Sequence, residues 1–243
     1  MTMRDLAVCR PSLYFIVNGK SELPESSVLS SGSASQSVPI VWGFYVLQMD
    51  GRTILIDTGF QDAVKAQQFR VTLHDPFPEL ASLAIEPRLV TDIVVTHHHF
   101  DHTGNIPRFP HARVIIQREA YELYRQEWPE HPEVPSSQLR RFDTEYDLDD
   151  LLHVRCIGGH TSGCSEVTFL YRGRRYLFPG DECYLLANFT RRTPIGFSDH
   201  PEVNRQYIKA LAQDAIVLPF HDPEILKKYT AFGDYIARVL PEA

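Results

Sequence analysis

The chain has 243 residues and a formal net charge of −7, which is enough length for a substantial hydrophobic core. The negative charge gives no broad support for binding a phosphate backbone, so we expect no nucleic-acid partner. Its four cysteines form no C-x-x-C pair, no stretch approaches the length of a membrane span, and the first residues lack the apolar core of a signal peptide. We expect one domain over residues 1–243, located in the cytoplasm and not attached to a membrane.

The first sixty residues predict an antiparallel sheet. Residues 13–17 are rich in β-formers, and residues 40–48 and 53–57 flank Asp50-Gly51, a type I′ hairpin signal. Residues 20–38 hold eight serines and no aromatic residue. This composition predicts a long loop between two strands, which is either a lid or binding loop or a mobile surface loop.

The rest of the chain alternates predicted strands and helices. Residues 60–90 are helical in pieces around a Pro76-Phe77-Pro78 break, and residues 138–150 read as an exposed charged face. Further strands are predicted at 89–95, 113–117, 151–157, 167–171, 175–178 and 215–219. Further helices are predicted at 119–128, 201–212 and 224–240.

Four metal-binding side chains lie within six residues after the predicted strand 89–95. The spacing is His-x-His-x-Asp-His, formed by His97, His99, Asp101 and His102. Side chains two apart on an extended segment point the same way, so His97 and His99 can bind one ion. Asp101 and His102 are adjacent and must diverge, which suits a second ion, and His98 is expected to point away. Burying this cluster without metal would leave many polar atoms unsatisfied.

Other candidate ligands also stand just after predicted strands. Because strand ends at one edge of a sheet bring distant loops together, His160, Asp181 and His221 are expected to join the cluster. The set then provides about three protein ligands for each of two ions and one shared carboxylate. Imidazole with carboxylate favours zinc, and iron, cobalt or manganese would also bind.

These motifs together resemble the metallo-β-lactamase fold superfamily, and within it the N-acyl homoserine lactonases that quench bacterial quorum-sensing signals. The resemblance rests on the His97-to-His102 cluster and on the segments Asp57-Thr58-Gly59, Gly159-His160-Thr161, Gly180-Asp181 and His221-Asp222. The lactonases also carry a tyrosine three residues beyond the bridging aspartate, and here Tyr184 matches it. The chain departs from the family at Ser162 and Cys164, where a proline and a second histidine are frequent. We expect Cys164 to be a buried thiol.

The resemblance implies an α+β fold, an αββα sandwich of two mixed β-sheets with helices on the outer faces. It implies that His97, His99 and His160 hold one ion, that Asp101, His102 and His221 hold the other, and that Asp181 bridges them. The implied reaction opens the lactone ring of an N-acyl homoserine lactone by attack of a metal-bridging hydroxide.

Roles for further residues follow from this resemblance. Tyr184 would stabilise the oxyanion, Asp101 would carry a proton to the leaving group, and Asp57 would orient a ligand histidine. Trp42, Phe44, Phe100 and Ile195 are candidates for the apolar groove that binds the acyl tail.

Other functions remain open on these residues. The enzyme could act on another lactone or on a thioester, as glyoxalase II does, although only about twenty residues follow His221 and that enzyme type uses a longer helical region. A phosphodiesterase or nuclease would want a basic arm, which the −7 charge does not favour. A metal-binding scaffold without catalysis is a further alternative. Monomer and homodimer are both compatible with the sequence.

Overall fold

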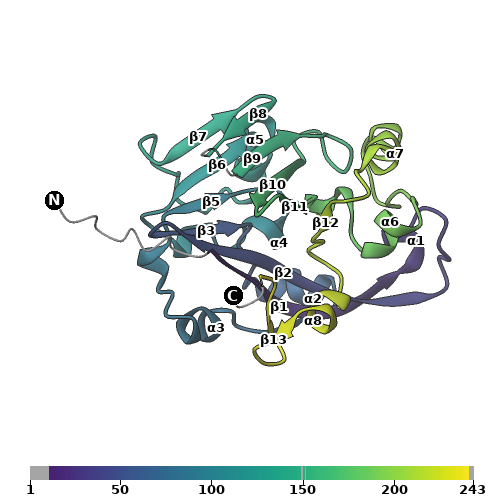
Figure 1. Ribbon diagram of the computed structural model, residues 1–243, viewed down its shortest axis with the longest axis horizontal. Coiled ribbons are helices and arrows are strands. Elements are labelled where there is room, and N and C mark those ends of the chain that lie inside the picture. The colour runs from purple at the N-terminus through teal and green to yellow at the C-terminus, as the bar shows by residue number, and fades with distance from the viewer. Residues whose placement is uncertain (1–10, 149, 151, 241–243) are drawn as a thin grey trace.

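The computed structural model describes residues 11–148, 150 and 152–240, and its strands form two sheets (Figure 1). The larger sheet has the order β13-β14-β1-β2-β3-β5-β6-β7, with β4 paired to β1. Its strands are β1 (Ser12–Pro24), β2 (Ser37–Met49), β3 (Arg52–Ile56), β4 (Thr72–Leu73), β5 (Asp92–Val94), β6 (Arg113–Gln117), β7 (Leu139–Phe142), β13 (Thr230–Ala231) and β14 (Ile236–Arg238). The smaller sheet has the order β12-β11-β10-β9-β8. Its strands are β8 (Glu145–Asp147), β9 (Leu152–Cys156), β10 (Ser165–Tyr171), β11 (Arg174–Phe178) and β12 (Ile216–Val217).

Both sheets are mixed. In the larger sheet β1, β2, β3 and β14 pair antiparallel, whereas β3, β5, β6 and β7 pair parallel. In the smaller sheet only the β11–β12 pair is parallel among the described strands. The β2–β3 hairpin turns at Asp50 and Gly51 with positive φ at both residues, which confirms the predicted type I′ turn.

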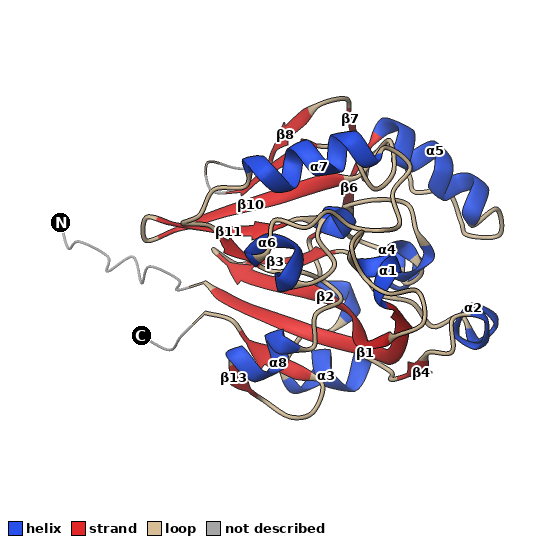
Figure 2. Cartoon of the chain, turned by 90° about the vertical axis from the view of Figure 1, so that its right-hand side faces the viewer, coloured by secondary structure: helices blue, strands red, loops and turns tan. Residues whose placement is uncertain are grey.

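Short helices cover the outer faces of the sheets (Figure 2). The α-helices are α1 (Glu25–Val28), α2 (Ala63–Gln68), α3 (Phe77–Ser82), α4 (Phe100–Thr103), α5 (Arg118–Glu127), α6 (Leu186–Thr190), α7 (Pro201–Ala210) and α8 (Glu224–Lys228), and the 3₁₀ turns are η1 (Pro87–Leu89), η2 (Ile106–Arg108) and η3 (Gly180–Glu182). Within the described part of the chain, no helix has the length and apolar character that crossing a membrane requires.

Alternating side chains on each strand build three core layers. Leu55 of β3 lies in one hydrophobic cluster with Leu80 of α3 and Tyr124 of α5. Its neighbour Ile54 points the other way and shares a second cluster with Phe169 of the smaller sheet. A third cluster joins α7 to the outer face of the smaller sheet. Helices, sheet, sheet and helix therefore stack as an αββα sandwich, which confirms the expected fold class.

Two predicted segments differ from the structure. Residues 20–38 are not one long loop, because β1 continues to Pro24, α1 follows, and β2 begins at Ser37. Residues 224–240 are not one helix, because the chain leaves α8 at Lys228 and returns as β14, which pairs with β1. The described residues within 138–150 are largely exposed, as expected, and they also contain β7 and β8, which extend the two sheets. In the two segments that differ, pairing between strands overrides the local pattern.

Candidate metal centre and cavity

The predicted ligands lie just past strand ends, as their sequence positions indicated. The His97-to-His102 cluster follows β5 and enters α4, and His160 stands in the loop after β9. Asp181 lies in η3 directly after β11, and His221 follows β12. Both sheets thus contribute loops to one site.

The ligand atoms converge into two groups. His97, His99, His160 and Asp181 form one group, and Asp101, His102, His221 and Asp181 form the other. Within each group all ligand atoms lie within 4.8 Å of one another. This division is the one that the family resemblance implied.

Asp181 belongs to both groups because its two oxygens face opposite ways. Oδ1 lies 3.1 Å from Nε2 of His221 and 3.3 Å from Nε2 of His102. Oδ2 lies 3.6 Å from Nε2 of His160 and 3.8 Å from Nε2 of His97. A carboxylate in this orientation is suited to bridge two cations.

The ring nitrogens that face away from the site contact protein oxygen atoms, which sets the ring orientation of each histidine. The contacts of Nδ1 are His97 to Thr96 Oγ1 at 3.2 Å, His102 to Asp57 at 2.7 Å, His160 to the Phe197 carbonyl at 3.0 Å, and His221 to the Val41 carbonyl at 3.0 Å. In each of these four rings Nε2 is left to point into the site.

Asp57 is fixed at the end of β3 by its neighbours. Its carboxylate accepts hydrogen bonds from the backbone N–H and the hydroxyl of Thr96, both at 2.7 Å. Its backbone has φ +64°, a left-handed conformation that aspartate tolerates better than most residues. This aspartate therefore lies where the sequence analysis expected it, behind a ligand histidine.

The site has the chemistry of a divalent-metal centre. Nε2 of His102 is buried and has no hydrogen-bond partner among the described atoms, and a metal ion would satisfy it. The imidazole and carboxylate donors match the preferences of zinc and similar divalent ions. The residues present therefore fit a pair of metal ions.

Burial and neighbouring charges shift the pKa values of the ligand histidines in opposite directions. Burial lowers the pKa of His97, His99 and His160, so their rings are neutral and ready to bind metal. Burial also acts to lower the pKa of His102, but the carboxylates of Asp101, Asp181 and Asp57 outweigh it and raise that pKa well above its ordinary value. Metal binding at the second group should accordingly release protons.

A cavity of about 310 Å³ opens beside the two ligand groups. It is lined by Leu23, Ser27, Ile40, Trp42, Lys65, Gln68, Phe69, His99, Phe100, Asp101, Glu127, Asp181, Tyr184, Phe197 and His221. The ring of Phe100 lies 5.8 Å from Trp42 and is stacked on Phe69 at 4.9 Å between ring centres. The wall next to the ligands is therefore largely aromatic.

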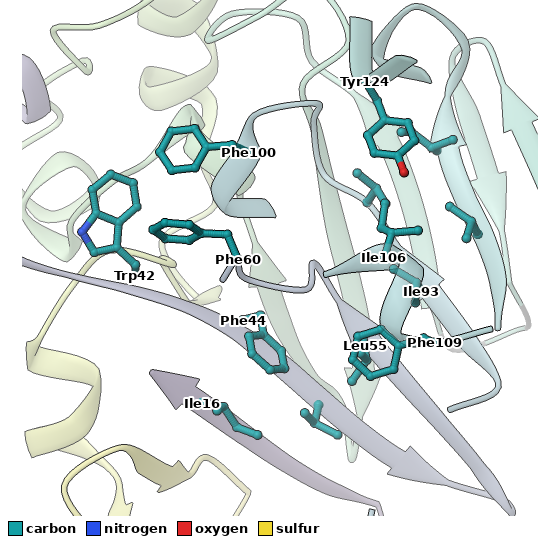
Figure 3. Close-up of a cluster of buried hydrophobic side chains, with 14 of the residues drawn as sticks. Ile16, Trp42, Phe44, Leu55, Phe60, Ile93, Phe100, Ile106, Phe109 and Tyr124 are labelled. Atoms are coloured by element: carbon teal, nitrogen blue, oxygen red, sulfur yellow. The ribbon is translucent and has the colours of Figure 1, made fainter. Parts of the chain in front are cut away.

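Two of the four expected groove residues lie elsewhere. Trp42 and Phe100 line the cavity, but Phe44 and Ile195 do not. Phe44 shares a face of β2 with Trp42 yet lies two residues further along, near Ile16 and Leu55 in the core (Figure 3). Ile195 is buried in the same cluster, and its N–H donates to Asn204.

Sequence reasoning missed several cavity residues. Phe197, with 60% of its surface exposed, lines the cavity two residues beyond Ile195. Ser27 comes from the serine-rich segment that was a candidate binding loop. Lys65 and Glu127 form an ion pair at the cavity. They join α2 to α5, which no local signal could have indicated.

Tyr184 lies between the ligand groups and the cavity. Its ring is 5.2 Å from that of His221 and 5.8 Å from that of His160. Burial raises the pKa of its phenol well above the ordinary value, and the carboxylates of Asp181 and Asp101 raise it further. The hydroxyl therefore stays protonated and can donate a hydrogen bond to a bound molecule.

Comparison with known proteins decides the family. The family model described as the metallo-beta-lactamase superfamily matches residues 44–221. The chain belongs to the metallo-beta-lactamase superfamily.

Two known proteins and one solved structure are similar to the chain over most of its length. An N-acyl homoserine lactonase of Bacillus thuringiensis is 26% identical over 246 residues, which cover 92% of this chain and 98% of the relative. A hydroxyacylglutathione hydrolase of Nitrosomonas eutropha is 30% identical over 185 residues, 73% of this chain and 64% of the relative. A solved N-acyl homoserine lactone hydrolase, with the product N-hexanoyl-L-homoserine at its catalytic metal centre, has a TM-score of 0.76 at 22% identity and covers 92% of this chain and 98% of that one.

Proposed function

We propose that this protein is a metal-dependent lactonase that opens the ring of N-acyl homoserine lactones. The observation that carries the proposal is the position of Asp181 between two complete ligand groups, with Tyr184 beside them on the wall of one cavity. The similarity to an N-acyl homoserine lactonase along nearly the whole chain supports this substrate class.

Two divalent metal ions at these groups, for which the donor set favours zinc, would lower the pKa of a water molecule and polarise the lactone carbonyl. The protein's own residues then orient the substrate and move the protons. The Tyr184 hydroxyl donates a hydrogen bond to the carbonyl oxygen, where negative charge develops during attack by water.

Asp101 is suited to proton transfer. Its Oδ2 lies 3.1 Å from Nε2 of His102 and 3.5 Å from Nε2 of His221, so that oxygen faces the ligand group. Asp101 also lines the cavity, and its other oxygen can accept a proton from the attacking water and pass it to the ring oxygen as the ester bond breaks. Asp57 keeps His102 oriented throughout.

The aromatic wall accounts for recognition of an acyl tail. Trp42, Phe69 and Phe100 present neighbouring apolar rings to the cavity, and Phe197 also lines it. An aliphatic chain of modest length gains free energy by leaving water for such a surface.

A thioester of glutathione is the second candidate, since a hydroxyacylglutathione hydrolase is 30% identical over part of its length. Glutathione is anionic and would need positive charge at the cavity. Lys65 is the one lysine or arginine among the described residues that line the cavity, and it already forms an ion pair with Glu127. This pairing favours a lactone with an uncharged tail.

The test is hydrolysis of a panel of acyl homoserine lactones by metal-reconstituted protein, followed by proton release. S-lactoylglutathione and a bis-aryl phosphodiester are assayed alongside, and chelator-treated protein is the control. We expect lactone opening that disappears with the chelator and returns with Zn²⁺. Metal-dependent cleavage of the thioester or the phosphodiester alone would replace the proposed substrate class, and inactivity on all three would favour a binding role.

A further inference from the structure

We propose that Glu182 is a positioning residue that holds His160 in place and thereby sets the affinity of the ion bound by His97, His99 and His160. This inference rests on the proposed metal-dependent function. Glu182 follows Asp181 in η3 and has no exposed surface. It lies outside both ligand groups, so metal binding does not explain why a carboxylate is buried there.

The Glu182 carboxylate is bound by three N–H donors. Oε1 accepts hydrogen bonds from the backbone N–H groups of Gly159 and His160, at 2.7 and 2.8 Å. Oε2 accepts from the side-chain amide of Asn204 at 2.8 Å. Charge-assisted hydrogen bonds of this kind are strong. The main chain of a metal ligand is therefore attached to the residue next to the bridging Asp181.

The close approach of Glu182 requires a glycine at position 159. A Cβ atom on Gly159 would lie 2.3 Å from Oε2 of Glu182 and 2.9 Å from the backbone of Asn204. Such distances are far below van der Waals contact. The absence of a side chain at Gly159 is what lets the carboxylate reach two successive backbone amides.

Asn204 extends the network from Glu182 to the segment that carries Ile195 and Phe197. Its Oδ1 accepts from the N–H of Ile195 at 3.0 Å, and its amide also donates to the Glu182 carbonyl at 2.9 Å. Two residues further along, the Phe197 carbonyl contacts Nδ1 of His160 at 3.0 Å. One closed series of hydrogen bonds, which begins and ends at Glu182, therefore fixes both the main chain and the ring of His160.

The substitution Glu182→Gln tests this role with little change of shape. The glutamine oxygen can still accept from Gly159 and His160, but its NH₂ group would face the NH₂ group of Asn204. We expect one of the two ions to bind about 10- to 100-fold more weakly, since losing a partner of a ligand has this effect in metalloproteins. Titration of metal-free protein with Co²⁺, followed by absorption and stoichiometry, measures both sites without relying on activity.

The double variant Glu182→Gln with Asn204→Asp restores the side-chain pairing in reverse. The new carboxylate accepts from the glutamine NH₂ and can still accept from the N–H of Ile195, but it cannot donate to the Glu182 carbonyl. Because Asn204→Asp alone lacks that donor as well, we expect the double variant to bind the ion more tightly than Asn204→Asp alone. Asn204→Asp alone places two carboxylates face to face and should weaken the same ion, which provides a second variant if Glu182→Gln does not fold.

Glu166→Gln is the matched control. Glu166 is also a buried carboxylate, which accepts hydrogen bonds from Arg155 and from the Tyr207 hydroxyl, and it is not a metal ligand. We expect it to lower the thermal stability of the metal-free protein and to leave both Co²⁺ affinities unchanged.

The outcomes separate this inference from the proposed function. If the wild-type chain binds fewer than two ions, the two-metal function itself is wrong and the inference falls with it. If the wild-type chain binds two ions and Glu182→Gln binds both as tightly, the inference alone is overturned. A double variant that binds this ion no more tightly than Asn204→Asp alone also overturns it, because a general packing defect would not respond to exchange of donor and acceptor.

Discussion

The Asp57 carboxylate lies 2.7 Å from Nδ1 of His102, while Nε2 of the same ring is buried without a hydrogen-bond partner among the described atoms. The end of β3 therefore orients a ligand that the chain supplies 45 residues later. His102 is the residue that would contact the ion, and Asp57 sets the orientation of its ring.

Asp57→Asn should weaken metal binding at the second group. Asparagine tolerates the positive φ at this position. Its neutral side chain, however, cannot accept a charge-assisted hydrogen bond from the His102 ring. We expect about a 10- to 100-fold loss of affinity for one ion, measured by competition with a chromophoric chelator. Asp92→Asn is the control, because Asp92 is a buried carboxylate of β5 that pairs with Arg52 and Arg113. Unchanged affinity in Asp57→Asn would show that the contact is only structural.

Tyr184→Phe should lower turnover and leave the metal content intact. The variant removes a protonated hydroxyl from the cavity wall and keeps the ring. Losing one donor to a developing oxyanion typically costs about 10²-fold in kcat. Tyr207→Phe removes a buried hydroxyl that donates to Glu166 at 2.8 Å, and it should keep full turnover. Equal loss of metal and of turnover in Tyr184→Phe would refute the role assigned to its hydroxyl.

Phe197→Ala should raise KM for long acyl tails more than for short ones. Phe197 is 60% exposed, so the substitution costs little stability and removes apolar surface from the cavity lining. We expect a rise of about 5- to 10-fold for a decanoyl tail, with little change for a butanoyl tail, from steady-state kinetics. Phe232→Ala, at a 50% exposed phenylalanine outside the cavity lining, is the control. A uniform rise for both tails would argue against contact between Phe197 and the tail.

Tyr124→Phe should make the fold less sensitive to alkaline pH. Burial raises the pKa of Tyr124 to about 12, above that of an unfolded tyrosine, about 10. The unfolded chain therefore loses this proton first, and stability falls as pH rises from about 10 to 12. Across this window we expect the free energy of unfolding to fall by about 2 kcal/mol less in the variant than in the wild type. Below about pH 9 the two curves of unfolding free energy against pH should be parallel. Urea unfolding at each pH measures the difference. Parallel curves up to pH 12 would contradict the prediction.

Several features of the site could be predicted because their signals are local. His97 and His99 are two residues apart on an extended segment, and the structure places them in one ligand group. Asp181, His160 and His221 each follow a strand, and strand ends meet at one edge. The β2–β3 hairpin was likewise visible in Asp50-Gly51, where both residues adopt positive φ.

The order of residues in the chain was thus enough to indicate the candidate ligands, the alternation of strands and helices, and the family. Which neighbours those residues meet depends on the folded arrangement. Trp42 reaches the cavity and Phe44 does not, although both lie on one face of β2. Residues 236–238 form β14 because β1 offered unpaired backbone groups at its edge, and residues 230–231 form β13 by pairing with β14. Glu182 reaches His160 only across a space that Gly159 leaves open. Each of these outcomes depends on contacts between segments far apart in the chain, and hydrophobic periodicity and motif spacing report only on neighbours in sequence.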